Sequence, residues 1–196
     1  MIDIAVLVQV SWSFIWLSRK SLQNALLYAG GFVSAGYVAW QTTGWVSQWM
    51  ALPSNPAFLW IEQHMTSGAQ AVAILTQFLP PQPVTTAMSQ SRFISLHVAR
   101  TLMFCMITIA VFITFSVIAQ LKSVIWDKGF ASPVTSAQST GLTYVVALVC
   151  SLYGAFIGLM LISNIAWLQP FHSLAPYIHA SLALHWYAIL LHYVHR

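Results

Sequence analysis

The residues best suited to chemistry in this chain are its histidines, five of which lie after residue 170. At 100° per residue, His185, His192 and His195 share one face of a helix. Imidazole is a common metal ligand and also ligates haem iron, so this face is a candidate metal or haem site. His97, in an earlier apolar segment, is a candidate partner for the histidines of the tail.

The same histidines have an alternative, purely interfacial interpretation. A haem site usually needs ligands that face each other from separate helices, whereas this cluster lies at the end of the chain. Histidines interleaved with Trp186, Tyr187 and Tyr193 are also typical of a helix at the membrane–water boundary. We favour the interfacial interpretation and expect no cofactor, with haem or metal binding as the alternative.

The rest of the sequence lacks the common catalytic motifs. It has no His-Glu-x-x-His pair, no glycine-rich phosphate loop and no Gly-x-Ser-x-Gly nucleophile motif. The acidic residues are Asp3, Glu62 and Asp127, too few for paired-carboxylate chemistry, and Asp3 is interpreted as an exposed terminal carboxylate. Cys105 and Cys150 lie in apolar runs and are predicted to be buried thiols. We predict that the protein is not an enzyme.

The composition places these residues in a lipid environment. Of 196 residues, 59% are hydrophobic and 5% are charged, and the mean hydropathy is +0.76. Because soluble domains carry about a quarter charged residues, the chain is predicted to be an all-α integral membrane protein with the lipid bilayer as its main partner. Its seven basic residues are scattered, which argues against a nucleic-acid partner.

Apolar segments divide this single membrane domain, residues 1–196, into its predicted helices. A membrane-spanning helix needs about 20 residues, so the first segment is short and requires protein neighbours. The predicted transmembrane helices are residues 2–17, 22–40, 96–121 and 141–168.

Two further helices are expected outside these spans. Between the second and third spans, apolar residues such as Phe58, Ile61 and Met65 recur at helical spacing. This pattern predicts an amphipathic interfacial helix over residues 57–78, in a long outward loop. Residues 176–195 are predicted to form a C-terminal helix that is interfacial or partly inserted.

The basic residues predict the orientation of the chain. Arg19 and Lys20 lie between the first and second spans, and Lys122 and Lys128 lie between the third and fourth. Cytoplasmic loops carry an excess of lysine and arginine, so these two loops are placed in the cytoplasm. Both termini are then predicted to lie outside.

Small residues predict how the spans pack. Lipid offers no hydrophobic drive for helix pairing, so helices in membranes meet where small side chains allow their backbones to approach. Buried polar groups at membrane depth must find partners, and Gln9 and Asn164 are predicted to hydrogen-bond between helices. The predicted packing seam between the second and fourth spans consists of Gly31, Ala35, Ala39, Ala147, Ser151, Gly154, Ala155 and Gly158.

Several short segments carry a family resemblance. They are the opening residues 1–7 (MIDIAVL), the basic turn at 19–20, the glycine pair at 30–31, and residues 152–158 (LYGAFIG) and 176–181 (PYIHAS). Together they resemble the colicin V production (CvpA) family of bacterial inner-membrane proteins, and Ser181 matches that family's terminal serine.

The resemblance implies a multi-pass protein of the bacterial inner membrane without catalytic residues. It implies a role in toxin production, secretion or envelope homeostasis, with small-solute passage as a further option. One alternative is a histidine-ligated metal- or haem-binding membrane subunit of a redox complex. Another is an accessory subunit of a larger assembly. The partners would then be further membrane proteins or copies of the same chain.

Overall fold

The computed structural model describes residues 1–50, 55–65, 75–80, 89–126 and 137–194. Within these ranges every regular element is helical, which confirms the predicted all-α class. The elements are α1 (Ile2–Ser18), α2 (Leu22–Met50), α3 (Pro56–Gln63), η1 (Thr76–Phe78), α5 (Gln90–Trp126), α6 (Ala137–Ile165), η2 (Gln169–Leu174), α7 (Ala175–His179) and α8 (Leu182–Val194).

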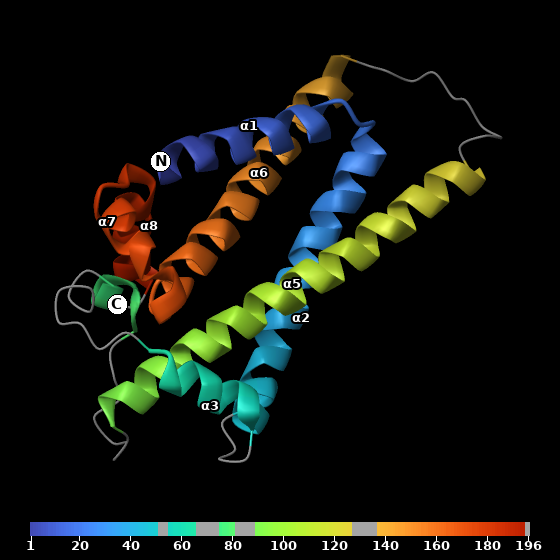
Figure 1. Ribbon diagram of the computed structural model, residues 1–196. Helices are drawn as coiled ribbons and strands as arrows, with labels where there is room; N and C mark the ends of the chain where they lie inside the picture. The colour runs from blue at the N-terminus through green and yellow to red at the C-terminus, as the bar shows by residue number, and fades with distance from the viewer. Residues whose placement is uncertain (51–54, 66–74, 81–88, 127–136, 195–196) are drawn as a thin grey trace.

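Four long helices, α1, α2, α5 and α6, form a bundle of antiparallel neighbours (Figure 1). Helix α1 lies against α6, and α2 lies against α5. The turn from α1 to α2, with Arg19 and Lys20, lies at the same end of the bundle as the C-terminus of α5 and the N-terminus of α6. We call this the basic end.

The short elements α3, η1, η2, α7 and α8 gather at the opposite end, and we call them the cap layer (Figure 1). The chain that leaves α3 pairs with the chain that leaves α6. The backbone N–H of Gln169 donates to the carbonyl of His64 at 2.8 Å, and Met65 and Leu168 form an antiparallel bridge. These contacts fix α3 beside the start of η2.

Among the described residues, two helical segments are long and apolar enough to cross a membrane, Gln90–Leu121 in α5 and Gly141–Ile165 in α6. Gln169–His179 and Leu182–Tyr193 would make a third if this pair, bent by 93°, acts as one broken span. Helix α1 is apolar but only 17 residues long. Helix α2 is longer, but its second half carries Gln41, Thr42, Thr43 and Gln48.

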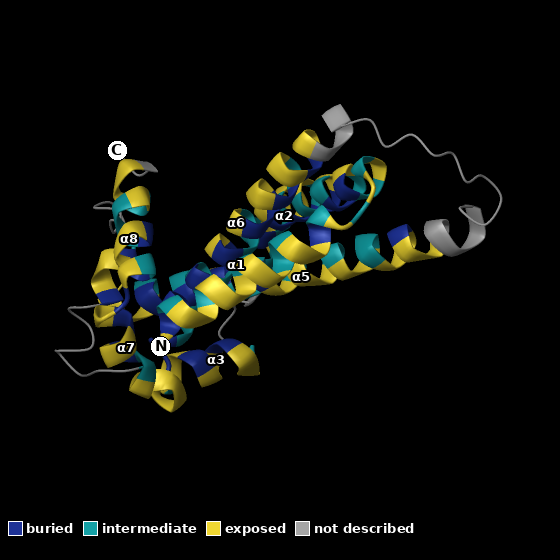
Figure 2. Ribbon diagram, turned by 90° about the horizontal axis from the view of Figure 1, so that it is seen from above, coloured by how far each residue is buried: buried dark blue, intermediate teal, exposed yellow. Residues whose placement is uncertain are grey.

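Within the described ranges, two apolar clusters hold the helices together, one near each end of the bundle. Figure 2 shows buried residues on the inner sides of the helices and a long exposed face on α5. The cluster near the basic end contains Leu17, Tyr28, Ala119, Ala147 and Cys150. The cluster under the cap layer includes Ile2, Phe58, Ile61, Leu75, Phe78, Ile94, Val98, Leu159, Trp167, Ile178, Leu184 and Tyr187.

Two predicted helices differ from the observed elements. In the predicted interfacial helix, 57–78, the structure has α3 and η1, and residues 66–74 between them lie outside the described ranges. The predicted C-terminal helix, 176–195, is divided into α7 and α8. It divides there because the Ser181 hydroxyl accepts the backbone N–H of Leu184 at 3.2 Å, the N-cap contact that begins a new helix.

Candidate functional site

The main polar centre between distant parts of the chain is the junction of Asp3 with the start of α8. One carboxylate oxygen of Asp3 accepts the Ser181 hydroxyl and the Ala183 N–H, both at 2.8 Å. The other oxygen accepts the N–H of Leu182 at 3.3 Å. Residues 178 to 180 positions apart in sequence are thus joined by one side chain.

This junction satisfies the first backbone donors of α8. A helix N-terminus leaves its first N–H groups without intrahelical partners and carries partial positive charge. The carboxylate of Asp3 accepts hydrogen bonds from the N–H groups of Leu182 and Ala183, and the hydroxyl of Ser181 accepts one from the N–H of Leu184. The expectation of an exposed terminal carboxylate is therefore wrong: Asp3 is half-buried and caps a helix from the other end of the chain.

Helix α8 is also anchored by its apolar face. Leu184 is fully buried, and the ring of Tyr187 is buried between two aromatic neighbours. Tyr187 stacks on Phe78 of η1 with ring centroids 5.8 Å apart, and it meets Phe156 of α6 edge-on at 5.1 Å. The capping carboxylate therefore fixes where α8 begins, while Tyr187 fixes which face it turns to the bundle.

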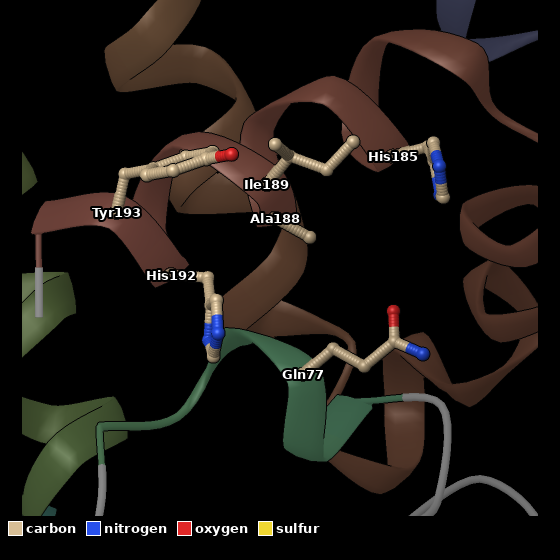
Figure 3. Close-up of a pocket in the computed structure, with 6 residues that line it drawn as sticks. All are labelled: Gln77, His185, Ala188, Ile189, His192 and Tyr193. Atoms are coloured by element: carbon tan, nitrogen blue, oxygen red, sulfur yellow. The ribbon is translucent and has the colours of Figure 1, made fainter. Parts of the chain in front are cut away.

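An open cleft of about 390 Å³ lies between α8 and η1 (Figure 3). Gln77, His185, His192 and Tyr193 supply its polar groups, with Ala188 and Ile189 between them. The two histidines stand at opposite ends of the cleft in Figure 3. Seven residues of helix separate them, a rise of about 10 Å, so they are poorly placed to hold one ion together.

The other candidate ligands lie apart from this cleft or outside the described ranges. His97 is half-buried on α5, and His195 is beyond the last described residue. Within the part of the chain that the structure describes, no group of three His, Cys, Asp or Glu residues is placed to hold a metal ion. The cleft therefore offers hydrogen-bonding groups and the apolar side chains of Ala188 and Ile189.

Gly31, one of the predicted seam residues of α2, faces Phe115 of α5. A side chain at Gly31 would meet the Phe115 Cβ at 3.0 Å, and the neighbouring Phe32 ring stacks on Phe112 at 4.0 Å. Ala35 and Ala39 are fully buried and share the helix face of Gly31.

Two of the predicted seam residues of α6, Gly154 and Gly158, contact Gln9 of α1. The Gln9 amide donates to the Gly154 carbonyl at 3.2 Å, and its oxygen lies 3.2 Å from the position of a Cβ at Gly158. The interhelical hydrogen bond predicted for Gln9 is confirmed. The seam residues Ala147, Ser151 and Ala155 are buried on α6.

Other polar groups of the long helices bond within their own helices. Asn164 donates to the Met160 carbonyl at 2.9 Å, so its predicted interhelical bond is not the one observed. Hydroxyls on α2, α5 and α6 donate to the carbonyl four residues earlier, a common local hydrogen bond of serine and threonine in helices. They include Thr43, Thr101, Thr108 and Ser151. Cys105 and Cys150 are buried free thiols, as predicted.

The contact of Gln9 with Gly158 makes a direct prediction. Gly158→Leu should push the Gln9 amide off the Gly154 carbonyl and separate α1 from α6, at a cost of about 1–2 kcal/mol. Thermal unfolding and size exclusion in mild detergent measure the loss. Gly141→Leu is the control, because a Cβ at Gly141 has no neighbour within 4 Å in the described structure. Equal stability of the two variants would contradict the α1–α6 contact.

Together these observations define a helical protein whose described part has two or three apolar helices long enough to cross a membrane, and a layer of short helices tied to the N-terminal helix. No family model, curated protein or solved structure matches the chain significantly.

Proposed function

We propose that the chain is a non-enzymatic, multi-pass protein of the bacterial inner membrane that acts in envelope homeostasis or in toxin production and secretion, as the colicin V production family does. The observation that carries the proposal is the hydrogen bond between Asp3 and Ser181. Each residue lies in one of the segments on which the family resemblance depends. Their hydrogen bond means that two segments with the family resemblance, far apart in sequence, contact each other in the fold.

The proposal includes four membrane crossings, by α1, α2, α5 and α6. Helix α1 spans about 25 Å, slightly less than the hydrocarbon core, and its side chains Leu7 and Trp12 are 67% and 73% exposed. Large exposed apolar side chains on a bundle helix are suited to lipid rather than water. Arg19 and Lys20 at the basic end then mark the cytoplasmic side, with both termini outside.

The polar contacts of the bundle support a structural rather than a catalytic role. Gln9 and the hydroxyls of Thr101 and Ser151 all bond to backbone carbonyls. The donor hydrogens of these groups are thus engaged by the backbone of the protein, and Gln9 joins α1 to α6. The functional surface is instead the cap layer, which presents α3 and α8 on the outward side of the membrane.

Genetic complementation tests this function. In a strain that lacks the gene, the wild-type chain should restore growth in a membrane-active detergent and export of a colicin V-type toxin, and Asp3→Ala should not. Glu62→Gln is the matched control, because it removes a carboxylate from an exposed site on α3. Expression and membrane insertion are measured in parallel by immunoblot of membrane fractions.

Two outcomes would contradict the proposal. A deletion strain with normal detergent resistance and normal toxin export would remove the envelope and secretion roles. Full complementation by Asp3→Ala at normal expression would separate the function from the Asp3–Ser181 contact that supports it.

A further inference from the structure

The cleft between α8 and η1 has polar ends and an apolar middle along α8. His185 and His192 stand at its two ends, and Ala188 and Ile189 lie between them (Figure 3). Positions 185, 188, 189 and 192 share one face of a helix, and the rise from the first to the last is about 10 Å. The cleft therefore matches an elongated ligand that also has polar ends and an apolar middle.

The opposite wall of the cleft is held in place by aromatic packing. Gln77 extends from η1 toward the space between the two histidines (Figure 3). The next residue, Phe78, stacks on Tyr187 of α8, and both rings are buried. The two walls therefore keep a fixed spacing, and a ligand would not lose affinity by having to order them.

The two histidines determine the charge of the cleft. They are the lining residues that can become positively charged, and imidazole is the side chain that changes its charge between about pH 5 and 8. A protonated imidazole donates from both ring nitrogens and accepts no hydrogen bond. The Gln77 amide and the Tyr193 hydroxyl can donate as well. In mildly acidic solution the cleft thus presents positively charged hydrogen-bond donors, which suit a carboxylate.

The elements around α8 leave this positive charge for a ligand to neutralise. Helix α8 packs mainly against α1, α6, α7 and η1. Of their charged residues and histidines, α1 has Asp3 and α7 has His179, while the ranges of α6 and η1 contain none. The carboxylate of Asp3 is engaged by the N–H groups at the start of α8. The six described residues that line the cleft include no carboxylate.

The separation of the histidines defines the shape of the anion. About 10 Å is close to the Debye length at physiological salt, so the repulsion between two protonated imidazoles is screened and both can be charged together. A single carboxylate is too small to reach both, so a ligand that uses both needs two carboxylates joined by a chain. The methylene groups of an aliphatic chain would lie on Ala188 and Ile189 and remove their apolar surface from water.

We propose that the cleft binds an aliphatic dicarboxylate, with one carboxylate on His185, the other on His192, and the chain over Ala188 and Ile189. Binding requires that both histidines are protonated. Gln77 supplies a further hydrogen-bond donor from the η1 wall. This site is separate from the Asp3–Ser181 contact, so dicarboxylate binding and the role in the cell envelope can fail independently.

Equilibrium dialysis of radiolabelled octanedioate against the full chain in nonionic detergent measures this binding. The wild type should bind it about tenfold more tightly at about pH 6 than at about pH 8, because imidazole loses its charge over this range. At the lower pH, His185→Gln and His192→Gln should each weaken binding about tenfold. His179→Gln is the control, because His179 is an exposed histidine at the end of α7 and does not line the cleft. All three histidines are exposed, so the variants should fold as the wild type does.

Three results would overturn the proposal. Equal affinity at the two pH values would mean that protonated histidines do not hold the ligand. A loss in His179→Gln as large as in the two cleft variants would mean that only the net charge of the protein attracts the dianion. Equally tight binding of butanedioate, which is too short, or of the monomethyl ester of octanedioate, which has one charge, would mean that the two histidines do not act together.

Discussion

Replacing Asp3 by alanine should release the start of α8 while leaving the bundle folded. The substitution removes the acceptor for the N–H groups of Leu182 and Ala183 and for the Ser181 hydroxyl. It also removes the negative charge that faces the positive end of the α8 dipole. Without the charged cap these donors lose their acceptor, which should lower the local stability at the start of α8 by about 3 kcal/mol.

Hydrogen exchange in mild detergent measures this release. Amides at the start of α8 should exchange roughly 100-fold faster in Asp3→Ala, because each 1.4 kcal/mol corresponds to a factor of about ten. Amides in the middle of α5 and α6 should keep their wild-type protection. Asp3→Asn should give a smaller effect, since it keeps one acceptor oxygen but loses the charge.

The exchange measurement has one control variant and two results that would contradict the prediction. Glu62→Gln should leave the exchange of α8 unchanged, because Glu62 is an exposed residue of α3. Unchanged α8 exchange in Asp3→Ala would show that Tyr187 and Leu184 hold α8 without the cap. Loss of protection throughout α5 and α6 would show that Asp3 supports the whole bundle instead of one helix.

The apolar helices of the bundle were predictable because their signal is local. The run from Leu102 to Ala119 and the run after Gly141 are long and uncharged, and the structure has α5 and α6 there. Long uninterrupted apolar stretches leave few alternatives to a helix in lipid. The number of membrane crossings was harder to predict, because α1 is short and the second half of α2 mixes tryptophans with Gln41 and Gln48.

The site at Asp3 could not be predicted from local pattern. Its contacts join residues at opposite ends of the chain, and no periodicity connects positions so far apart. One local signal was present: Ser181 precedes an apolar helical run, as N-cap residues do. That signal indicates where α8 begins, but it does not identify the carboxylate that completes the cap.

For the small residues, the sequence likewise indicated the buried face of the helix but not the helix that packs against it. The four-residue spacing of Gly31, Ala35 and Ala39 correctly indicated a buried stripe, since spacing defines a helix face. It did not identify the opposing helix, because that depends on bulky partners such as Phe115 and on Gln9. The pattern also missed Gly36, which lies off the stripe and faces Tyr153 of α6.

Gly36→Ala should destabilise the bundle, and Tyr153→Phe should rescue it. A Cβ at Gly36 would overlap the Tyr153 hydroxyl, whereas the ring carbon that carries this hydroxyl lies 3.4 Å away, an ordinary contact distance. Overpacking of this kind costs about 1–3 kcal/mol, and removing the hydroxyl should recover most of it.

A double-mutant cycle of thermal unfolding in detergent measures the coupling between these two positions. Gly30→Ala is the control on the same helix: a Cβ there meets nothing within 4 Å in the described structure, so alanine should be neutral or slightly stabilising. If Gly36→Ala is destabilising and Tyr153→Phe restores stability, α2 and α6 meet through this pair. Destabilisation that persists in the double variant would mean that Gly36 is required for a contact other than Tyr153, and the packing of α2 on α6 would need another explanation.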